Sequence, residues 1–337
     1  MNTGRIRKVV VLGSTGSLGA QTLQVLEKYK KHFKVIGLSA YENKELLRQQ
    51  AKKFEVQKEN VVLASKDGSQ KITDLAKLKD ADIVINVLSG IAGIEPSKAA
   101  LESGKTLLLG NKESLISSGM KLLKMPGKII PIDSEHNAIS EILKKYPKKK
   151  VGKIILPCSG GPLWSKTDRQ LKKVTIKDVL QHPKWNMGEK MAVESATLLN
   201  KGLEIIEAYY LFLLPLKKIE VVIHPECMIH GIVEFAGGER IAYISKPDMK
   251  EHIENALLAA SGMKASTRVI RKLKRKEYVF QNPNHKILHG INIVLKVFQQ
   301  NPYKMENFLQ KEEETINKFL KGKIKFLEIF SALEKID

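Results

Sequence analysis

Acidic and basic side chains gather in IPIDSEHNAI, residues 130–139, directly after an apolar run that predicts a strand. Asp133 and Glu135 stand two positions apart, so an extended or turning backbone places both carboxylates on one side, within reach of one cation. Carboxylate oxygens are hard ligands that suit Mg²⁺ or Mn²⁺ better than Zn²⁺. A helix N-cap with an acid in its first turn is the alternative interpretation.

A metal site of this kind needs a third acid, and Glu204 in NKGLE is the candidate. Acids are scarce in the apolar segment to which it belongs, LEIIEAYYLFLLPL, residues 203–216. Lys201 lies one helical turn before it, so a salt bridge on a helix surface is the alternative for this pair.

The segment GSTGSLG follows the first predicted strand and carries a glycine at every third position. Such glycines permit a tight turn and a close backbone approach, and the following helix offers N–H groups to a pyrophosphate. We therefore predict a dinucleotide site, with a ligand-free glycine turn as the alternative. The predicted cofactor-binding residues of this loop are Gly13, Ser14, Thr15, Gly16, Ser17, Leu18 and Gly19.

The end of the second predicted strand bears on the choice between NAD and NADP. NAD sites carry an acid there for the ribose hydroxyls, whereas this strand ends in Ser39 and Ala40. Glu42 follows soon after, but Asn43 and Lys44 come next and can face a 2′-phosphate. The sequence favours NADPH, with Asn43 as a predicted cofactor contact.

The segment GNKESLIS, residues 110–117, ends the fifth predicted strand. Open α/β sheets bind ligands at the carboxyl ends of their strands, so the position of Lys112 and Glu113 indicates a function. We predict Asn111 and Glu113 as cofactor contacts. A lysine and glutamate pair on the surface is the alternative.

Three further segments supply groups that bind a phosphate monoester: SGGPLW, HPKWNMG and ESATLLNKG. Hydroxyls, an amide, an imidazole and an ammonium are what such a dianion requires. Each of these side chains taken alone is more often structural than catalytic. The candidates are Ser159, His182, Ser195, Asn200 and Lys201.

Strands alternate with helices over the first part of the chain, which predicts an α/β fold with a Rossmann-like doubly wound parallel sheet. From about Gly152 the regular alternation of strands and helices ends. The segment ESATLLNKGLEIIEAYYLFL, residues 194–213, predicts one long helix. Residues 220–245 alternate between apolar and polar like antiparallel strands around a turn at Gly237 and Gly238. After about Asn282 the chain reads as helical, with breaks at Asn301-Pro302 and Lys321-Gly322. The expected domains are an NADPH-binding Rossmann-like domain at 1–151, with the first metal ligands at its junction, a central α+β catalytic domain at 152–281, and a short C-terminal helical domain at 282–337.

Composition restricts the partners and the compartment. A net charge of +21 over 337 residues raises the question of nucleic acid, but the lysines are scattered, few aromatics accompany them, and no nucleic-acid motif is present. We therefore expect no nucleic acid as a partner, and no membrane because no apolar run reaches the length of a membrane span.

Cysteine use and the N-terminus bear on the compartment. Cys158 and Cys227 lie far apart, and the N-terminus enters a strand almost at once, which predicts a reducing cytoplasm.

These motifs, in this order, resemble the 1-deoxy-D-xylulose 5-phosphate reductoisomerase family. The resemblance covers most of the chain and rests on GSTGSLG, AGIEPS, GNKESL, DSEHNAI, SGGP, HPKWNMG, ESATLLNKGLE, HPECMIH and PDM. It implies a homodimeric enzyme that rearranges a phosphorylated keto sugar with a divalent metal (Mg²⁺, Mn²⁺ or Co²⁺) and reduces the product with NADPH. The implied product is 2-C-methyl-D-erythritol 4-phosphate, made for isoprenoid biosynthesis.

The resemblance also implies roles for individual residues. Asp133, Glu135 and Glu204 match the metal ligands, and Lys112 with His182 completes the catalytic set. The implied substrate contacts are Lys112, Ser134, Ser159, His182, Trp185, Met187, Ser195, Asn200, Lys201 and His230, with Trp185 and Met187 on a loop that closes over the substrate.

The sequence departs from the family's usual pattern at Tyr41 and Glu42, at Glu189 and Glu194, and in QKEEE at 310–314. Two alternatives to the family's own activity therefore remain. One is a metal-dependent oxidoreductase of similar fold acting on another phosphorylated keto sugar, and the other is a relative that binds the cofactor without catalysis.

Overall fold

The computed structural model describes residues 5–182, 184–185, 187–263, 269–273, 278–281 and 288–335. Contacts divide the chain into two units, Met1–Asn137 with Asp248–Ser266, and Ala138–Pro247 with Thr267–Asp337. The domain boundaries expected at 151/152 and 281/282 stay predictions.

The first unit contains a six-stranded parallel sheet of order β3-β2-β1-β4-β5-β6. The strands are β1 (Arg7–Leu12), β2 (Phe33–Ala40), β3 (Val61–Leu63), β4 (Ile83–Asn86), β5 (Thr106–Leu109) and β6 (Lys128–Pro131). Strand order reverses between β1 and β4, the position at which doubly wound sheets bind ligands. The predicted Rossmann-like sheet is thus confirmed.

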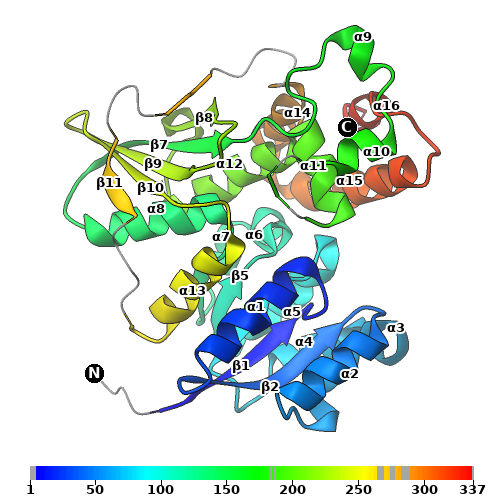
Figure 1. Ribbon diagram of the computed structural model, residues 1–337, viewed down its shortest axis with the longest axis vertical. Coiled ribbons are helices and arrows are strands. Elements are labelled where there is room, and N and C mark those ends of the chain that lie inside the picture. The colour runs from blue at the N-terminus through cyan, green and yellow to red at the C-terminus, as the bar shows by residue number, and fades with distance from the viewer. Residues whose placement is uncertain are drawn as a thin grey trace. The chain divides into compact units, whose positions relative to one another are not determined.

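Helices cover both faces of this sheet (Figure 1). One face packs against α1 (Ser17–Lys28), α2 (Lys44–Lys53) and α13 (Met249–Ala260), which share a buried apolar core with β1 and β4. On the other face α4 (Ser69–Ala76) lies so close that a Cβ on Gly37 of β2 would be 2.8 Å from Leu75 Cδ1. The remaining helical elements are η1 (Lys58–Asn60), α3 (Ala64–Asp67), η2 (Gly90–Gly93), α5 (Ile94–Glu102), α6 (Lys112–Ser118) and α7 (Met120–Leu123).

The second unit contains a five-stranded mixed sheet of order β11-β10-β9-β7-β8. Its strands are β7 (Val151–Cys158), β8 (Ile219–Ile223), β9 (Ile229–Phe235), β10 (Arg240–Ile244) and β11 (Ile270–Lys272). β7 and β8 are parallel, and the other neighbours are antiparallel. β9 and β10 pair around the turn predicted at Gly237 and Gly238, so the expected second, α+β sheet is confirmed.

The helices of the second unit carry most of the side chains that are predicted to bind the substrate phosphate (Figure 1). They are α8 (Ser134–Lys145, whose first turn belongs to the other unit), α9 (Asp168–Leu171), α10 (Ile176–Leu180), α11 (Glu189–Thr197), α12 (Leu199–Phe212), η3 (Leu216–Lys218), α14 (Leu288–Gln300), η4 (Pro302–Lys304), α15 (Met305–Leu320) and α16 (Glu328–Leu333). The helical C-terminal region and its breaks near Asn301 and Lys321 are confirmed over the described residues 288–335.

The single long helix predicted at 194–213 is wrong. The structure has two helices, because Leu198 takes a left-handed backbone conformation with φ of 56° and ends α11 before α12 begins. Apolar residues are buried on both sides of Leu198, so the hydrophobic periodicity continues through the break without revealing it. The break sets Ser195 and Asn200 on different helix axes.

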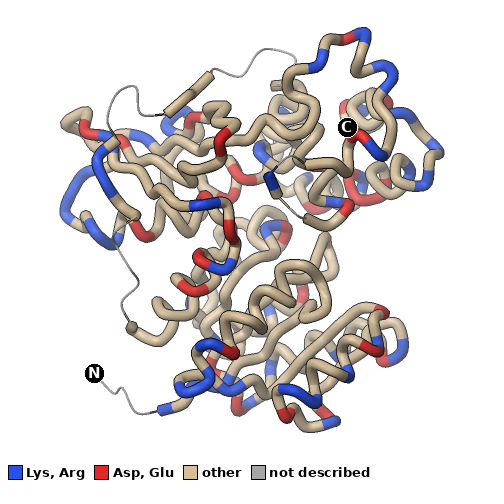
Figure 2. The backbone as a smooth tube through the Cα atoms, in the orientation of Figure 1, with Lys and Arg blue, Asp and Glu red and all other residues tan. Residues whose placement is uncertain are grey.

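Lysine and arginine recur along most helices and loops in Figure 2 rather than in one segment. Over the described part of the chain, no helix combines the length and the apolar character needed to cross a membrane.

Candidate active site

The glycine loop joins β1 to α1 with the geometry of a nucleotide turn. Gly13 has φ of 85°, and a Cβ there would lie 2.9 Å from Val87 O, so this position requires glycine. A Cβ on Gly19 would lie 2.1 Å from Gly13 O, which lets the helix pack directly on the turn. Gly16 and Ser17 are exposed at the start of α1, and Thr15 and Leu18 are half-buried. The N-terminus of α1 can therefore receive an anion.

Ser14 stabilises this loop through its side chain. Its hydroxyl donates to Gln50 Oε1 at 2.7 Å, its oxygen lies 3.2 Å from Ser39 O, and Ser14 is fully buried. The loop is thereby attached to the end of β2 and to α2.

Gly19→Ala is expected to destabilise the first unit by about 3 kcal/mol, because a methyl group overlaps backbone that cannot move aside. Gly16→Ala is the matched control, since its Cβ would find only Gly13 O at 3.5 Å, an ordinary contact. Urea unfolding of both variants measures the difference. Equal stability of the two variants would contradict the packing described here.

The end of β2 leads into an exposed segment. Tyr41 is 70% exposed, and Glu42, Asn43 and Lys44 are exposed as well. Asn43 caps α2 by accepting a hydrogen bond from Leu46 N at 3.1 Å. Asn43, the predicted cofactor contact, therefore lies at the carboxyl edge of the sheet. Glu42, the acid that bears on the choice between NAD and NADP, lies there as well.

Asn111 and Glu113 are buried and hold the segment that follows β4. The Asn111 amide donates to Gly90 O at 2.7 Å and Leu88 O at 3.0 Å, and Glu113 Oε1 accepts from Gly90 N at 3.0 Å. Asn111 also caps α6 by accepting from Ser114 N at 3.1 Å. These bonds fix the loops at the switch point of the sheet, and the two cofactor contacts themselves stay predictions.

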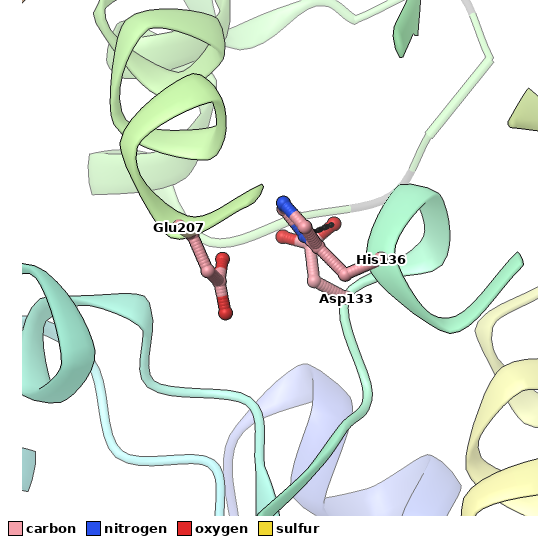
Figure 3. Close-up of side chains that lie close together, drawn as sticks. All are labelled: Asp133, His136 and Glu207. Atoms are coloured by element: carbon pink, nitrogen blue, oxygen red, sulfur yellow. Dashed lines mark ion pairs between the residues drawn. The ribbon is translucent and has the colours of Figure 1, made fainter. Parts of the chain in front are cut away.

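Asp133 lies between a lysine and a histidine at the start of α8. Lys112 Nζ, on a side chain only 5% exposed, lies 3.0 Å from Asp133 Oδ2, and His136 Nδ1 lies 3.5 Å from Asp133 Oδ1. Figure 3 shows the Asp133–His136 pair at the start of α8. Burial opposes ionisation of Asp133, but Lys112 and His136 outweigh it and hold the pKa of this carboxyl well below its usual range. The carboxylate is thus charged at neutral pH.

Glu135 adds a second carboxylate beside Asp133. The two side chains each offer an oxygen within 4.8 Å of the other, and Glu135 accepts a hydrogen bond from the Ser134 hydroxyl. Two anionic oxygens this close suit a hard divalent cation. The helix N-cap interpretation and the metal interpretation of this segment are compatible, because Asp133 directly precedes α8 and Glu135 lies in its first turn.

Glu204 is 2% exposed on α12, one turn from Asn200 and Lys201. It accepts a hydrogen bond from the Asn200 amide and forms an ion pair with Lys201. Lys201 Nζ also donates to Pro157 O at 2.8 Å, which ties α12 to β7. The salt bridge considered for Lys201 and Glu204 therefore forms, and it is buried instead of lying on the surface.

Ser159 and His182 meet within the second unit. Ser159 Oγ lies 3.1 Å from His182 Nε2, and Gly161 N donates to the same oxygen at 3.1 Å. His182 Nδ1 accepts from Trp185 N at 3.0 Å and Lys184 N at 3.2 Å, so the proton of the neutral ring is assigned to Nε2. Ser159 then accepts two hydrogen bonds and can donate its own O–H to an anion. Burial lowers the pKa of His182, which keeps the ring neutral.

We predict that kcat/KM falls on acidification through the pKa of His182, below its ordinary value of 6.5. Because the pKa of His182 is lower in the folded protein than in the unfolded chain, the neutral ring stabilises the folded loop at pH values above the pKa of the unfolded chain. This stability is lost as the pH falls through the pKa of the folded protein. His182→Asn keeps an acceptor near Nδ1 but cannot titrate. Its pH profile should show a lower plateau with a smaller acidic decline than the wild type. Identical acidic limbs, set by the substrate phosphate alone, would exclude His182 as the titrating group.

The remaining predicted substrate contacts also lie in the second unit. The rings of Trp185 and His230 pack edge to face at 6.1 Å, and His230 Nε2 lies 3.3 Å from Ser245 O. Met187 is half-buried, and Pro183 and Asn186 of the same loop lie outside the described residues. Ser195 is half-buried on α11, and a Cβ at Gly161 would lie 2.5 Å from Ser195 O. Ser159 and Ser195 are therefore carried by segments packed backbone to backbone.

His136 was missed as a functional candidate, although it stands in the segment from which the acids were chosen. It is fully buried and faces Asp133. The available signal was its place three residues after Asp133 at a helix start, a spacing that brings two side chains onto the same face.

A parallel sheet with a glycine turn after its first strand and an ionised acid at its carboxyl edge is typical of dinucleotide-dependent oxidoreductases. Comparison with known proteins narrows this class. A family model described as 1-deoxy-D-xylulose 5-phosphate reductoisomerase matches residues 9–67 and 55–119, and one described as the C-terminal domain of that enzyme matches 129–212.

Among curated proteins, the 1-deoxy-D-xylulose 5-phosphate reductoisomerase of Sulfurihydrogenibium sp. is 40% identical over 98% of this chain and 91% of its own length. That of Thermodesulfovibrio yellowstonii is 36% identical over 98% and 92%. Among solved structures, the enzyme from Zymomonas mobilis in complex with NADPH is 30% identical with a TM-score of 0.84, covering 98% of this chain and 91% of that one. The chain belongs to the 1-deoxy-D-xylulose 5-phosphate reductoisomerase family. The family predicted from the motifs, and with it an enzyme of mixed α/β fold, is confirmed.

Proposed function

We propose that this chain converts 1-deoxy-D-xylulose 5-phosphate to 2-C-methyl-D-erythritol 4-phosphate with NADPH and a divalent metal, as a step of isoprenoid biosynthesis. Family membership supports the reaction, and one observation carries it into this chain. Asp133, held ionised by Lys112 and His136 beside Glu135, has the charge and position that a metal-dependent reaction on sugar oxygens requires.

Asp133, Glu135 and Glu204 are the proposed metal ligands. Their carboxylate oxygens fit a hard cation such as Mg²⁺, and a solved relative with a TM-score of 0.85 is described in complex with NADPH, fosmidomycin and magnesium. Glu204 is held in place by Asn200 and Lys201, so its carboxylate is already oriented on α12. Mn²⁺ and Co²⁺ are alternatives that the same ligand set would accept.

The glycine loop is the proposed site of the NADPH pyrophosphate. Its fit rests on the positive φ of Gly13, the contact that a Cβ on Gly19 would break, and the exposed start of α1. Asn43 and Lys44 would face the 2′-phosphate, and Asn111 and Glu113 would keep the neighbouring loops in place for the nicotinamide end.

The substrate phosphate is proposed to lie against Ser159, Ser195, Asn200 and Lys201. Ser159 can donate its hydroxyl proton because its oxygen already accepts from Gly161 N and His182. Lys201 provides the positive charge. Trp185 and Met187 would exclude water on the side of the loop, with His230 behind Trp185.

The proposed chemistry combines a rearrangement with a reduction. When bound, the metal polarises the ketone and a neighbouring hydroxyl of the sugar, and NADPH supplies the hydride that reduces the resulting aldehyde. Lys112 holds its ammonium beside these oxygens and keeps Asp133 ionised. Ser134 supports Glu135 through its hydroxyl, so that both acids keep their orientation during the rearrangement.

A spectrophotometric assay tests the proposal directly. Purified protein with 1-deoxy-D-xylulose 5-phosphate and Mg²⁺ or Mn²⁺ should oxidise NADPH, and a chelator should stop the reaction. A preference for NADH would trace to Glu42. Oxidation with another phosphorylated keto sugar only, or no oxidation by folded protein, would favour the alternative substrate or a cofactor-binding relative without catalysis.

A homodimer and a cytoplasmic location are proposed alongside the activity. The dimer follows from the family resemblance, and analytical ultracentrifugation tests it. The location rests on two cysteines that lie far apart in the chain. Nucleic acid is not proposed as a partner, because the lysines and arginines are dispersed (Figure 2).

A further inference from the structure

A glutamate interrupts the buried stripe of α15. The apolar residues of this face recur at helical spacing, and Glu312 stands among them with a fully buried side chain. The stripe consists of Met305, Phe308, Leu309, Ile316 and Phe319. Burying a carboxylate in apolar surroundings is costly unless a positive charge compensates it, so its environment calls for explanation.

The compensating charge comes from α11. Lys190 Nζ lies 3.5 Å from Glu312 Oε2, and the same ammonium forms an ion pair with Glu194 one turn along its own helix. The side chains are 16% exposed for Lys190, 2% for Glu194 and 0% for Glu312. α11 and α15 pack against each other in the second unit, so this cluster lies within a helix contact.

Ser195 immediately follows Glu194 on α11. Successive helical residues point about 100° apart, so fixing the rotation of α11 through Lys190 and Glu194 also fixes the direction of the Ser195 hydroxyl. α11 begins at Glu189, directly after the segment that contains His182, Trp185 and Met187. The ion cluster therefore holds one end of that loop as well as the serine.

A charged cluster fixes geometry in a way that an apolar contact does not. Replacing a buried ion cluster by apolar side chains is often neutral or stabilising, so stability alone does not explain why a lysine and two glutamates occupy this helix contact. Ammonium and carboxylate groups have preferred distances and directions, which restrict rotation of one helix against the other.

We propose that Lys190 is a positioning residue that locks α11 to α15 through Glu194 and Glu312, and thereby orients Ser195 toward the substrate phosphate. This role rests on the proposed function. α15, a helix of the C-terminal region, then takes part in substrate binding without contributing a side chain to the site.

Lys190→Met should raise the KM for 1-deoxy-D-xylulose 5-phosphate by about tenfold while kcat changes by less than about threefold, because uniform binding is lost. The KM for NADPH should not change. Lys190→Arg keeps the charge and should recover most of the substrate affinity. Glu314→Gln is the matched control, since Glu314 belongs to the same acidic run but is exposed.

An apolar replacement of the whole cluster separates positioning from stability. Lys190→Met with Glu194→Leu and Glu312→Leu removes these three charges and completes the stripe of α15, so urea unfolding should show stability restored relative to Lys190→Met. The KM for the substrate should nevertheless stay raised. If KM returned to the wild-type value together with stability, the cluster would be structural only and the positioning role would be refuted.

The wild-type assay separates this proposal from the function on which it rests. Folded wild-type protein that does not turn over the substrate would refute the proposed function, and the role of Lys190 with it. Normal wild-type turnover with an unchanged KM in Lys190→Met would refute the positioning role alone.

Discussion

Glu204→Gln is expected to keep the fold and the binding of NADPH while turnover falls by roughly two orders of magnitude or more. The amide retains the size of the side chain and its contact with Asn200, but it removes the charge of one of the three proposed metal ligands. Weaker coordination affects both the cation and the sugar oxygens that the cation holds. The KM for Mg²⁺ should therefore rise together with the loss of kcat.

Steady-state kinetics over a Mg²⁺ series, with NADPH affinity from fluorescence titration, measures both effects. Glu234→Gln serves as the control, because Glu234 lies on β9 in an ion pair with Arg240 and outside the proposed site. Turnover that stays unchanged in Glu204→Gln would remove Glu204 from the metal site and leave it as the partner of Lys201.

Local patterns were sufficient to predict the fold and most of the candidate groups. The buried runs of β1 and β2 and the glycines after β1 carry their own conformational requirements, because glycine alone fits a φ of 85° beside Val87. The acids at 133 and 135 were found because they follow a strand directly. In each case the information lies within a few neighbouring residues.

Features that depend on distant residues were not predictable in this way. The left-handed Leu198 divides a segment whose apolar periodicity continues across it, so the sequence predicted one helix where there are two. The buried state of Lys112 depends on Asp133, and that of Glu312 depends on Lys190. The sequence alone predicts that a charged side chain is exposed, because charged residues are rarely buried without a partner. Only the tertiary structure shows the distant partner that allows burial.

Lys112→Met is expected to abolish most turnover and to destabilise the protein by about 3 kcal/mol at neutral pH, because it leaves a buried carboxylate without its ammonium partner. In the wild type the pKa of Asp133 is held low, so the ionised carboxyl contributes stability above its unfolded pKa, and this is lost as the pH falls through the folded pKa. Without Lys112 the opposing effect of burial gains weight, and the pKa of Asp133 rises.

The sign of the pH dependence follows from that rise. If the pKa of Asp133 in Lys112→Met lies above its unfolded value, folding favours the protonated form, and the variant loses least stability in acid and most at high pH. Urea unfolding at pH 5 and pH 8 should thus show a larger deficit against wild type at pH 8. Lys124→Met, at an exposed position of the same unit, should show no such difference. A deficit independent of pH would mean that Lys112 acts through packing of its aliphatic chain and does not set the charge of Asp133.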